Sequence, residues 1–455
     1  MRGDPDMSTV LFTTHPATGH VRPLLPVARE IADTGHEVHW YTGRKFEPHV
    51  VSAGARFLPI TADLPHDTTG DSLEAEYANR QGLLQVRRVL TEVFLETVPA
   101  YVADLERHVE AIRPDAVVAD HGFVPAMFLA ARRGVPSVVF GLNPLSVSSV
   151  DTAPFGTGLA PSSSPVGRLR NRALYWIARD VLLRRAHRAA RDIVAAIGCG
   201  PYRGLITDWP FQAADRYLQT GLPEFEYPRS DMPDNVEFIG VTAQEGVDEG
   251  TPPGWWEDVA RARAEGRPVV VVTQGTTSTN PGRLLLPAIE GLAGRRALVV
   301  ATTAGRDPDD VLPPHVRPDN LRIEGFVPFS ELLPAADLLV CTGGFGSVQI
   351  ALSHGVPLVV AGTTEDKMES NARVEWSGVG VSLRTDRPRA AGVRAAVERV
   401  LADPGIRARS RRYREALRAY GGASRGAEVV LEEASRSRTE VSRRREARAR
   451  RSGRS

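Results

Sequence analysis

Two residues in the first third of the chain have the types and positions that acid–base chemistry requires. His20 stands in the loop Thr-Gly-His after an apolar run at 9–14, and Asp120 is the last residue of the run PDAVVAD. An imidazole, with an ordinary pKa of about 6.5, suits a general base near neutral pH. A carboxylate bonded to one ring nitrogen orients the ring and stabilises the imidazolium formed on proton abstraction. The pair predicts a base and its partner, against the alternative that each residue only caps a following helix.

Glycine-rich and small-residue loops in the second half of the chain are suited to an anion. Residues 342–347, Thr-Gly-Gly-Phe-Gly-Ser, lie between an apolar run and a helix-like segment. Glycines allow close backbone approach and a helix N-terminus offers unpaired N–H groups, so a diphosphate is the natural guest. A second small-residue loop, Gly-Thr-Thr at 275–277, follows another apolar run. The alternative for the glycine-rich loop is a tight strand-to-helix turn.

A third group, Glu365-Asp366-Lys367, combines acids with a long polar side chain, which together can hold the hydroxyls of a sugar. Lys367 stands out because the chain has only one other lysine, Lys45, among 56 basic residues. An ammonium group at this position can reach a sugar hydroxyl or a diphosphate. The alternatives are a helix N-terminus that carries acids, and an exposed lysine paired with Glu365 or Glu369.

These loops require a scaffold whose strand ends meet. Apolar runs of strand length alternate with segments of helical periodicity along most of the chain. The expected strands lie at 9–14, 37–43, 113–122, 135–141, 268–276, 296–303, 320–325, 335–344, 356–362 and 379–383. Strands that alternate with helices predict an α/β fold with parallel, doubly wound sheets, whose ligands bind beyond the carboxyl ends of the strands.

The alternation is interrupted once, which predicts two domains. Residues 241–254 lack periodicity and gather glycine, proline and acids, as an interdomain linker does. We therefore expect a Rossmann-like domain over 8–240, a second one with closing helices over 255–433, and an active site in the cleft between them. The Ser-, Pro- and Gly-rich stretch 142–166 predicts a long loop. Residues 168–197 predict a helix whose apolar face packs on the core, with membrane contact as the alternative.

The last residues carry a concentrated positive charge. Residues 435–455 hold nine arginines and two glutamates, a net charge of +7 in a chain whose total is +1. With so few apolar residues the segment cannot offset the entropy lost on ordering, so we expect a disordered basic tail over 434–455. A solvated tail is favoured over a nucleic-acid or membrane contact, because the remainder of the chain is acidic.

Composition excludes several other classes of protein. With 42% apolar and 24% charged residues over 455 positions, the chain can form sizeable cores. Cys199 and Cys341 are far apart and outside any metal-binding pattern, which argues against a disulfide framework and a cysteine-based zinc site. No run reaches the ~18 apolar residues of a membrane span, and no signal peptide is evident. We expect a cytoplasmic protein with no stable membrane insertion and no nucleic-acid partner.

The motifs occur in an order that resembles one family. GHVRP near the start, VVAD about a hundred residues later, then FVP, TGGFGS, GVP and EDK are similar in order and spacing to the family-one glycosyltransferases. That family has the GT-B architecture of two Rossmann-like domains, and it includes macrolide and plant secondary-metabolite glycosyltransferases. The resemblance covers roughly residues 8–433. It implies that His20 is the catalytic base, that Asp120 is its partner, and that a nucleoside-diphosphate sugar is the co-substrate.

The same correspondence implies a donor site in the second domain. Phe326-Val327 match the loop that receives the nucleotide base, and residues 342–347 match the diphosphate loop. Asp366-Lys367 match the pair that holds the sugar. With the small-residue loop 275–277 included, the predicted donor-binding residues are Gly275, Thr276, Thr277, Phe326, Val327, Thr342, Gly343, Gly344, Gly346, Ser347, Asp366 and Lys367.

The chain departs from the family pattern at several donor-site positions. The family usually has His at Thr342, Trp at Phe326, Gln at Phe329, Glu at Ile350 and Gln at Lys367. The exchange at Ile350 removes a carboxylate that would bind the ribose hydroxyls, and Gln349 beside it is rotated by about 100° on a helix. These departures leave the sugar and the nucleotide, UDP or TDP, open.

Together these features predict an inverting hexosyltransferase, which moves a sugar from a UDP or TDP donor to a hydroxyl of a small, largely apolar acceptor. A natural product of antibiotic biosynthesis is the expected kind of acceptor. We expect no cofactor and no metal beyond the nucleotide sugar, and a monomer or homodimer. Two alternatives stay open: a catalytically silent auxiliary partner of a glycosyltransferase, and a GT-B-fold sugar-nucleotide epimerase. The acceptor-binding residues are not predicted, since variable loops such as 142–166 would build that pocket.

Overall fold

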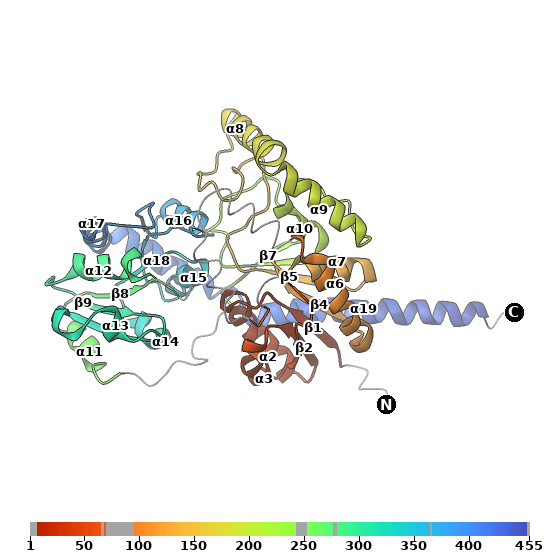
Figure 1. Ribbon diagram of the computed structural model, residues 1–455, viewed down its shortest axis with the longest axis horizontal. Coiled ribbons are helices and arrows are strands. Elements are labelled where there is room, and N and C mark those ends of the chain that lie inside the picture. The colour runs from red at the N-terminus through yellow and green to blue at the C-terminus, as the bar shows by residue number, and fades with distance from the viewer. Residues whose placement is uncertain are drawn as a thin grey trace.

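The computed structural model describes residues 7–64, 68–69, 95–242, 253–275, 280–364 and 366–452, without the side chains of 440–452. Two parallel sheets, each flanked by helices, lie side by side in Figure 1. The predicted α/β class with two doubly wound sheets is confirmed. The predicted site residues Thr276 and Thr277 lie outside the described residues, as do Glu365 and most of the predicted linker.

The first sheet has seven parallel strands in the order β3-β2-β1-β4-β5-β6-β7. They are β1 (Thr9–Thr13), β2 (Glu37–Thr42), β3 (Arg56–Pro59), β4 (Ala116–Asp120), β5 (Ser137–Gly141), β6 (Arg216–Thr220) and β7 (Val236–Gly240). The helices between them include α1 (Thr18–Val21), α2 (Leu25–Asp33), α3 (Glu47–Ser52), α6 (Val98–Ile112), α7 (Val124–Arg133) and α10 (Trp209–Ala213). The strand order reverses between β1 and β4, and open α/β sheets bind ligands at such a point.

The second sheet has six parallel strands in the order β10-β9-β8-β11-β12-β13. They are β8 (Val269–Thr273), β9 (Leu298–Thr302), β10 (Leu321–Glu324), β11 (Leu338–Cys341), β12 (Leu358–Val360) and β13 (Gly380–Ser382). The helices of this half include α11 (Glu257–Ala264), α12 (Leu285–Leu292), α13 (Pro308–Val311), α14 (Phe329–Leu332), α15 (Phe345–Ser353), α16 (Lys367–Trp376), α17 (Ala390–Ala402) and α18 (Pro404–Leu417). Here the strand order reverses between β8 and β11.

Strand β8 shows why these strands appear in the sequence as unbroken apolar runs. Val269 and Val271 belong to the core on one face of the sheet, and Val270 and Val272 to the core on the other. All four side chains are 0% exposed. Helices cover both faces of a parallel sheet, so every position along a central strand is buried and alternation of polar residues disappears.

Helix α19 (Ala423–Ser452) returns from the second domain to the first. Ala427, Val429 and Val430 are part of the first domain's core. The chain that enters α19 lies directly against the end of β7, where the Gly422 N–H donates to the Ile239 carbonyl at 2.7 Å. The prediction that the second domain extends to residue 433 therefore differs from the structure, because the first turns of α19 complete the core of the first domain.

The same helix corrects the prediction of a disordered tail over 434–455 as far as Ser452, and residues 453–455 lie outside the described part of the chain. The backbone of α19 is helical to Ser452, and its C-terminal part extends away from both domains in Figure 1. Its 30 residues contain no proline and one glycine, and arginine, alanine and glutamate are strong helix formers. Arg438 also donates to the Met7 carbonyl at 2.7 Å. Helix propensity thus orders a backbone that has little apolar surface to bury.

The segment predicted as one core-facing helix over 168–197 is divided and partly turned outward. It forms α8 (Pro165–Trp176), a π-helical turn (Ile177–Leu182) and α9 (Arg184–Ala196). In α8 it is Gly167 and Asn171 that are buried. The exposed apolar residues of α8 and the turn are Val166, Leu169, Trp176, Ile177, Val181 and Leu182. Among the residues that the structure describes, no helix is long and apolar enough to cross a membrane.

Candidate active site

The first sheet brings His20 and Asp120 together. His20 lies in α1, which follows β1, and Asp120 ends β4. Strands β1 and β4 are parallel neighbours, with Thr13 opposite Ala119. Their carboxyl ends therefore meet at one edge of the sheet, although the two residues are 100 positions apart. His20 Nδ1 lies 2.8 Å from Asp120 Oδ1, as the sequence predicted for a base and its orienting carboxylate.

The carboxylate of Asp120 is buried and has several hydrogen-bond donors. Its side chain is 0% exposed, whereas that of His20 is 25% exposed. Oδ1 accepts from the Gly122 N–H at 2.8 Å as well as facing His20, and Oδ2 accepts from the His15 N–H at 2.8 Å. This geometry fixes the carboxylate, which in turn fixes the imidazole of His20 with one edge toward solvent. A buried carboxylate that is bonded on both oxygens is a rigid support for a base.

Two further histidines, His15 and His121, surround the pair. The His15 and His20 rings meet edge to face with centroids 5.6 Å apart, and the His20 and His121 rings stack at 5.7 Å. Burial alone would raise the pKa of Asp120, but the facing His20 and its hydrogen bond, with the two other imidazoles nearby, hold that pKa well below its usual range. Burial lowers the pKa of His121 to about 4. The site thus holds an ionised carboxylate and a neutral His121 at neutral pH.

Gly122 permits the close packing of these groups. A Cβ at this position would lie 3.1 Å from Asp120 Oδ1 and 3.3 Å from carbon atoms of both the His15 and His20 rings. That separation is tighter than ordinary van der Waals contact. The glycine therefore lets the backbone N–H approach the carboxylate while both imidazoles stay in place.

The predicted donor-binding loops lie at the corresponding edge of the second sheet. Strands β8 and β11 are parallel neighbours, so the loops that follow them are adjacent. Thr342 Oγ1 donates to the Gln274 carbonyl at 3.3 Å, next to Gly275, whose φ is +74°. The structure thus brings the predicted residues Gly275 and Thr342 together. At Thr342 a hydroxyl bonded to the neighbouring loop stands where the family usually has an imidazole.

The glycine loop after β11 is held from behind by Asn371 of α16. Asn371 Nδ2 donates to the Gly362 carbonyl at 2.9 Å and to the Thr342 carbonyl at 3.3 Å. A Cβ on Gly343, whose φ is +85°, would lie 1.6 Å from Asn371 Oδ1. Only glycine fits between the helix and the loop, so Gly343 serves this packing as well as any ligand.

Helix α15 begins at the end of this loop and presents its N-terminus there. Gly344 is the N-cap, Gly346 is exposed and Ser347 is partly exposed. Asp366 Oδ2 accepts from the Phe345 N–H at 3.4 Å, so the predicted sugar-binding acid lies beside the predicted diphosphate loop. Helix N-termini with open N–H groups attract phosphates.

Lys367 is the first residue of α16 and is 7% exposed. A Cβ on Gly362 would lie 3.0 Å from Lys367 Cδ, so the lysine stem packs against the strand end that faces the donor loops. This burial corrects the alternative of an exposed surface lysine. Glu369, the partner which that alternative named, bonds instead to Arg373 and to backbone N–H groups.

The predicted base-binding residues differ in burial. Phe326 is 69% exposed and its ring lies over Gly305, where a Cβ would approach Phe326 Cε2 to 2.8 Å. Val327 is buried in the core of the second domain. An aromatic face that is open to solvent beside the predicted nucleotide site is suited to stack on a base. Gln349 is buried and accepts from the Tyr413 hydroxyl at 2.9 Å, so it does not replace the missing ribose-binding carboxylate.

Comparison with known proteins places the chain in a family. Residues 297–430 match the family model of the erythromycin biosynthesis protein CIII-like C-terminal domain. The chain is 41% identical to the 4'-demethylrebeccamycin synthase of Lentzea aerocolonigenes, over 89% of this chain and 94% of that protein. It belongs to the family-one glycosyltransferases. This glycosyltransferase is also 34% identical to UDP-glycosyltransferase 2 of Phaeomoniella chlamydospora, over 88% of this chain and 90% of that protein.

Solved structures share the fold of the glycosyltransferase. CalG4, the calicheamicin glycosyltransferase, superposes with a TM-score of 0.70 at 23% identity, over 94% of this chain and 99% of that chain. The glycosyltransferase VinC, solved in complex with DTDP, gives a TM-score of 0.65 at 20% identity, over 94% of this chain and 100% of that chain. The predicted GT-B architecture is confirmed, and the chain is an enzyme of the secondary-metabolite group.

Several residues around the site were not singled out from the sequence of the glycosyltransferase. His121 directly follows Asp120 and His15 lies five residues before His20, so their nearness in sequence to the predicted pair could have indicated both. Asn371 and Arg373 carried no such signal, because they lie on a helix among other polar residues. Within the described ranges no group of three or more His, Cys, Asp or Glu side chains is placed to hold a metal ion.

Proposed function

We propose that this glycosyltransferase transfers its sugar with inversion, with His20 as general base. The observation that carries the proposal is the 2.8 Å contact of His20 Nδ1 with a buried, multiply bonded Asp120. With Nδ1 directed at the carboxylate, Nε2 is the atom that takes the proton of the acceptor hydroxyl. The acceptor oxygen then bonds to the anomeric carbon, and the bond to the diphosphate breaks on the opposite face. Asp120 stabilises the imidazolium that results.

The second domain supplies the stabilisation of the leaving diphosphate. The N-terminus of α15, the glycines before it and Ser347 offer N–H and hydroxyl donors where negative charge develops. Asp366 and Lys367 lie beside this loop and hold the sugar hydroxyls. The nucleotide sugar is a co-substrate, and the site contains no resident cofactor in this proposal.

The identity of the substrates follows from the relatives only as a class. Relatives named as UDP-glycosyltransferases and a structure holding DTDP support a UDP or TDP sugar as donor. The 4'-demethylrebeccamycin synthase supports a small natural product as acceptor. We propose that the acceptor is largely apolar and presents one hydroxyl to His20. The intact His20–Asp120 pair supports an enzyme rather than a silent auxiliary partner.

A two-step experiment tests this function. Thermal shifts with UDP, TDP, GDP and ADP identify the nucleotide, since a ligand that binds the folded state raises Tm by mass action. Transfer from the glucose conjugate of the best nucleotide to a panel of phenolic and polyketide alcohols is then followed by chromatography, and the product anomer is read by NMR. An α-linked donor that gives a β-linked product supports inversion, and an α-linked product overturns it. A sugar epimer released without any acceptor would instead support the epimerase alternative.

A further inference from the structure

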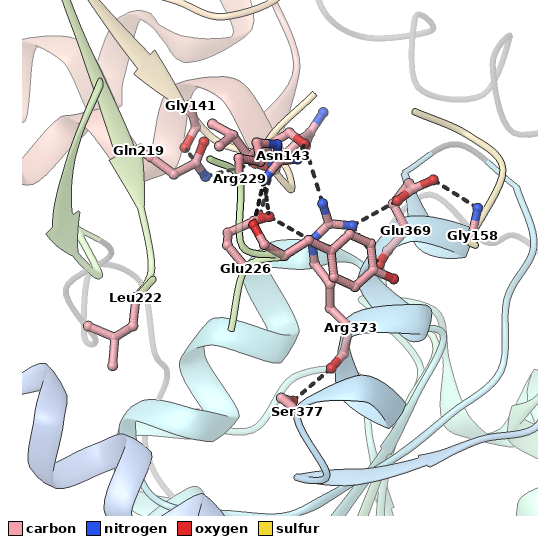
Figure 2. A network of polar contacts seen from close by, with 12 residues as sticks. Gly141, Asn143, Gly158, Gln219, Leu222, Glu226, Arg229, Glu369, Arg373 and Ser377 are labelled. Atoms are coloured by element: carbon pink, nitrogen blue, oxygen red, sulfur yellow. Dashed lines mark hydrogen bonds and ion pairs between the residues drawn. The ribbon is translucent and has the colours of Figure 1, made fainter. Parts of the chain in front are cut away.

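Helix α16 connects the donor loops of the glycosyltransferase to its other domain. Asn371 holds the glycine loop from one side of this helix. Glu369 and Arg373 extend from the same helix to segments of the first domain, as Figure 2 shows. A single helix of 10 residues therefore contacts both the diphosphate loop and the long loop after β5.

Arg373 is the centre of this contact. Its side chain is 1% exposed, and its Nε donates to Glu226 Oε2 at 2.9 Å while Nη1 donates to Glu369 Oε2 at 2.8 Å. Glu226 comes from the segment after β6 and is 3% exposed, and the Arg373 guanidinium lies 4.2 Å over the Tyr227 ring. With Arg229, whose side chain is 2% exposed, the cluster holds two positive and two negative charges. Buried charges require such pairing, so the cluster resists separation of its parts.

The cluster fixes the backbone of the loop after β5 at Leu145. The Leu145 N–H donates to Glu226 Oε1 at 2.7 Å. Its carbonyl accepts from Arg229 Nη2 at 2.8 Å and from Arg373 Nη2 at 3.3 Å. Both polar groups of this peptide position are thus held by charged side chains, one of which belongs to the donor domain. Charge-assisted hydrogen bonds of this kind are roughly twice as strong as neutral ones.

Glu369 fixes the same loop at a second point. Its Oε1 accepts from the Gly156 N–H at 2.8 Å and from the Gly158 N–H at 2.9 Å, and its side chain is 4% exposed. A Cβ on Gly158, whose φ is +60°, would lie 2.9 Å from Met368 Cγ. The loop therefore lies directly on the first turn of α16, two residues from Lys367. Gly158 thus allows an approach that a side chain would block.

We propose that Glu369 and Arg373 are positioning residues, which hold loop 143–158 of the first domain on the donor helix and so close the reacting centre to water. The inference rests on the proposed transfer reaction. It implies that acceptor and donor are brought into register by α16, because this one helix holds both the loop and the diphosphate site. Loops that close over an active site exclude competing water in this way.

Release of the loop should admit water in place of the acceptor. The water oxygen would then bond to the anomeric carbon while the bond to the diphosphate breaks with its electron pair on the diphosphate, and the water proton would pass to His20. The free sugar and nucleoside diphosphate are the products. A role confined to stabilising the interface predicts no such change, so hydrolysis of the donor separates the two roles.

The test compares Glu369→Ala, Glu369→Gln and Glu375→Ala in the full-length protein. Glu375 is a matched control on the same helix, because it is 45% exposed and pairs only with Arg384 among the contacts that the structure describes. The measurements are the Kd for UDP or TDP by calorimetry, the release of glucose from the matching nucleotide sugar without acceptor, and hydrogen exchange of peptides over 143–158 with the nucleotide bound.

For Glu369→Ala we expect a nucleotide Kd within about two-fold of wild type, glucose release raised about five-fold or more, and faster exchange confined to 143–158. Glu369→Gln should show the same changes at smaller size, since its amide oxygen still accepts from both glycine N–H groups. Glu375→Ala should match wild type.

Unchanged glucose release and exchange in Glu369→Ala would overturn the proposal. A nucleotide Kd that weakens in parallel would also overturn it, since Glu369 would then support the donor site itself. If Glu369→Ala does not fold, Glu369→Gln decides by the same criteria. A wild-type protein that binds neither nucleotide and releases no glucose would refute the proposed function instead, so the two failures are distinguishable.

Discussion

The two halves of the proposed active site differ in how much of their geometry the fold has already built. On the first domain, Asp120 is buried and bonded on both oxygens, and His20 is set against it. On the second domain, Phe326 and Gly346 are exposed and the glycine loop ends at an open helix N-terminus. The proposed base is thus fixed before any substrate arrives, whereas the proposed donor site offers groups that a ligand must complete. Changes in the first half should affect kcat, and changes in the second should affect donor affinity.

The largest effect is expected from His20→Ala. Loss of the general base should lower kcat by ~10²–10⁴-fold, and the nucleotide Kd should stay near wild type because the donor loops lie on the other domain. Steady-state transfer kinetics and calorimetry with UDP or TDP measure the two quantities. A His20→Ala variant with wild-type kcat on an alcohol acceptor would show that His20 is not the general base.

The pH dependence of stability tests the burial of His121 beside the His20–Asp120 pair of the first domain. The pKa of His121 is lowered to about 4 in the folded protein, so between its unfolded value near 6.5 and pH 4 only the unfolded chain takes up the proton. Stability from this group is therefore present above pH 6.5 and falls as the pH drops, by up to about 2 kcal/mol at pH 5. Urea unfolding at pH 7.5 and pH 5.0 should show that the free energy of unfolding falls more for wild type than for His121→Asn. Equal falls would contradict a lowered pKa of His121 in the folded protein.

Lys367→Gln tests the charge on the donor side. If the buried ammonium serves the sugar or the diphosphate, the variant should lose about 1.5–3 kcal/mol of donor binding or change its sugar preference. Lys45→Gln is the matched control, because Lys45 is the other lysine and is exposed. Partial recovery in Lys367→Gln with Thr342→His would indicate that the role is charge near the phosphates. Unchanged donor affinity and sugar choice would show that the lysine has a packing role only.

Phe326→Ala should have a smaller effect. Removal of the exposed ring takes away a stacking surface for the nucleotide base, which should weaken nucleotide binding by roughly 1 kcal/mol. The Tm of the unliganded protein should change little, since the ring is 69% exposed. Phe326→Trp, the residue that the family usually has, is the informative counterpart and should bind at least as tightly as wild type.

Truncation after Glu440 should have the smallest effect. The buried part of α19 ends near Ala434, so loss of 441–455 should leave Tm and kcat within error of wild type. Truncation after Gly422 should instead unfold the first domain, because it removes Ala427, Val429 and Val430 from its core. Circular dichroism melting of the two truncated proteins checks both outcomes.

The sequence by itself determined the fold class and the two sheets, and it predicted the pair His20 and Asp120 that the structure brings together. The parallel strands are buried on both faces, so their apolar runs were plain, and the loops at their carboxyl ends carry His20, Asp120 and the glycine motif. The strands β3, β6 and β7 were not predicted, since they lie toward the edge of the first sheet and mix polar with apolar residues. The donor-binding roles all remain predictions, and Thr276 and Thr277 also lie outside the described residues.

Only the tertiary structure decided what depends on contacts between distant segments. The outward apolar face of α8, the return of α19 to the first domain and the burial of Lys367 each depend on which surface packs beside a helix. Helical periodicity defines a face without saying what covers it. The cluster of Glu226, Glu369 and Arg373 joins residues up to 147 positions apart, and each alone is an ordinary charged residue of a surface helix or loop. A charge becomes a buried partner only when the fold brings its counter-charge to the same place, and no local pattern records that.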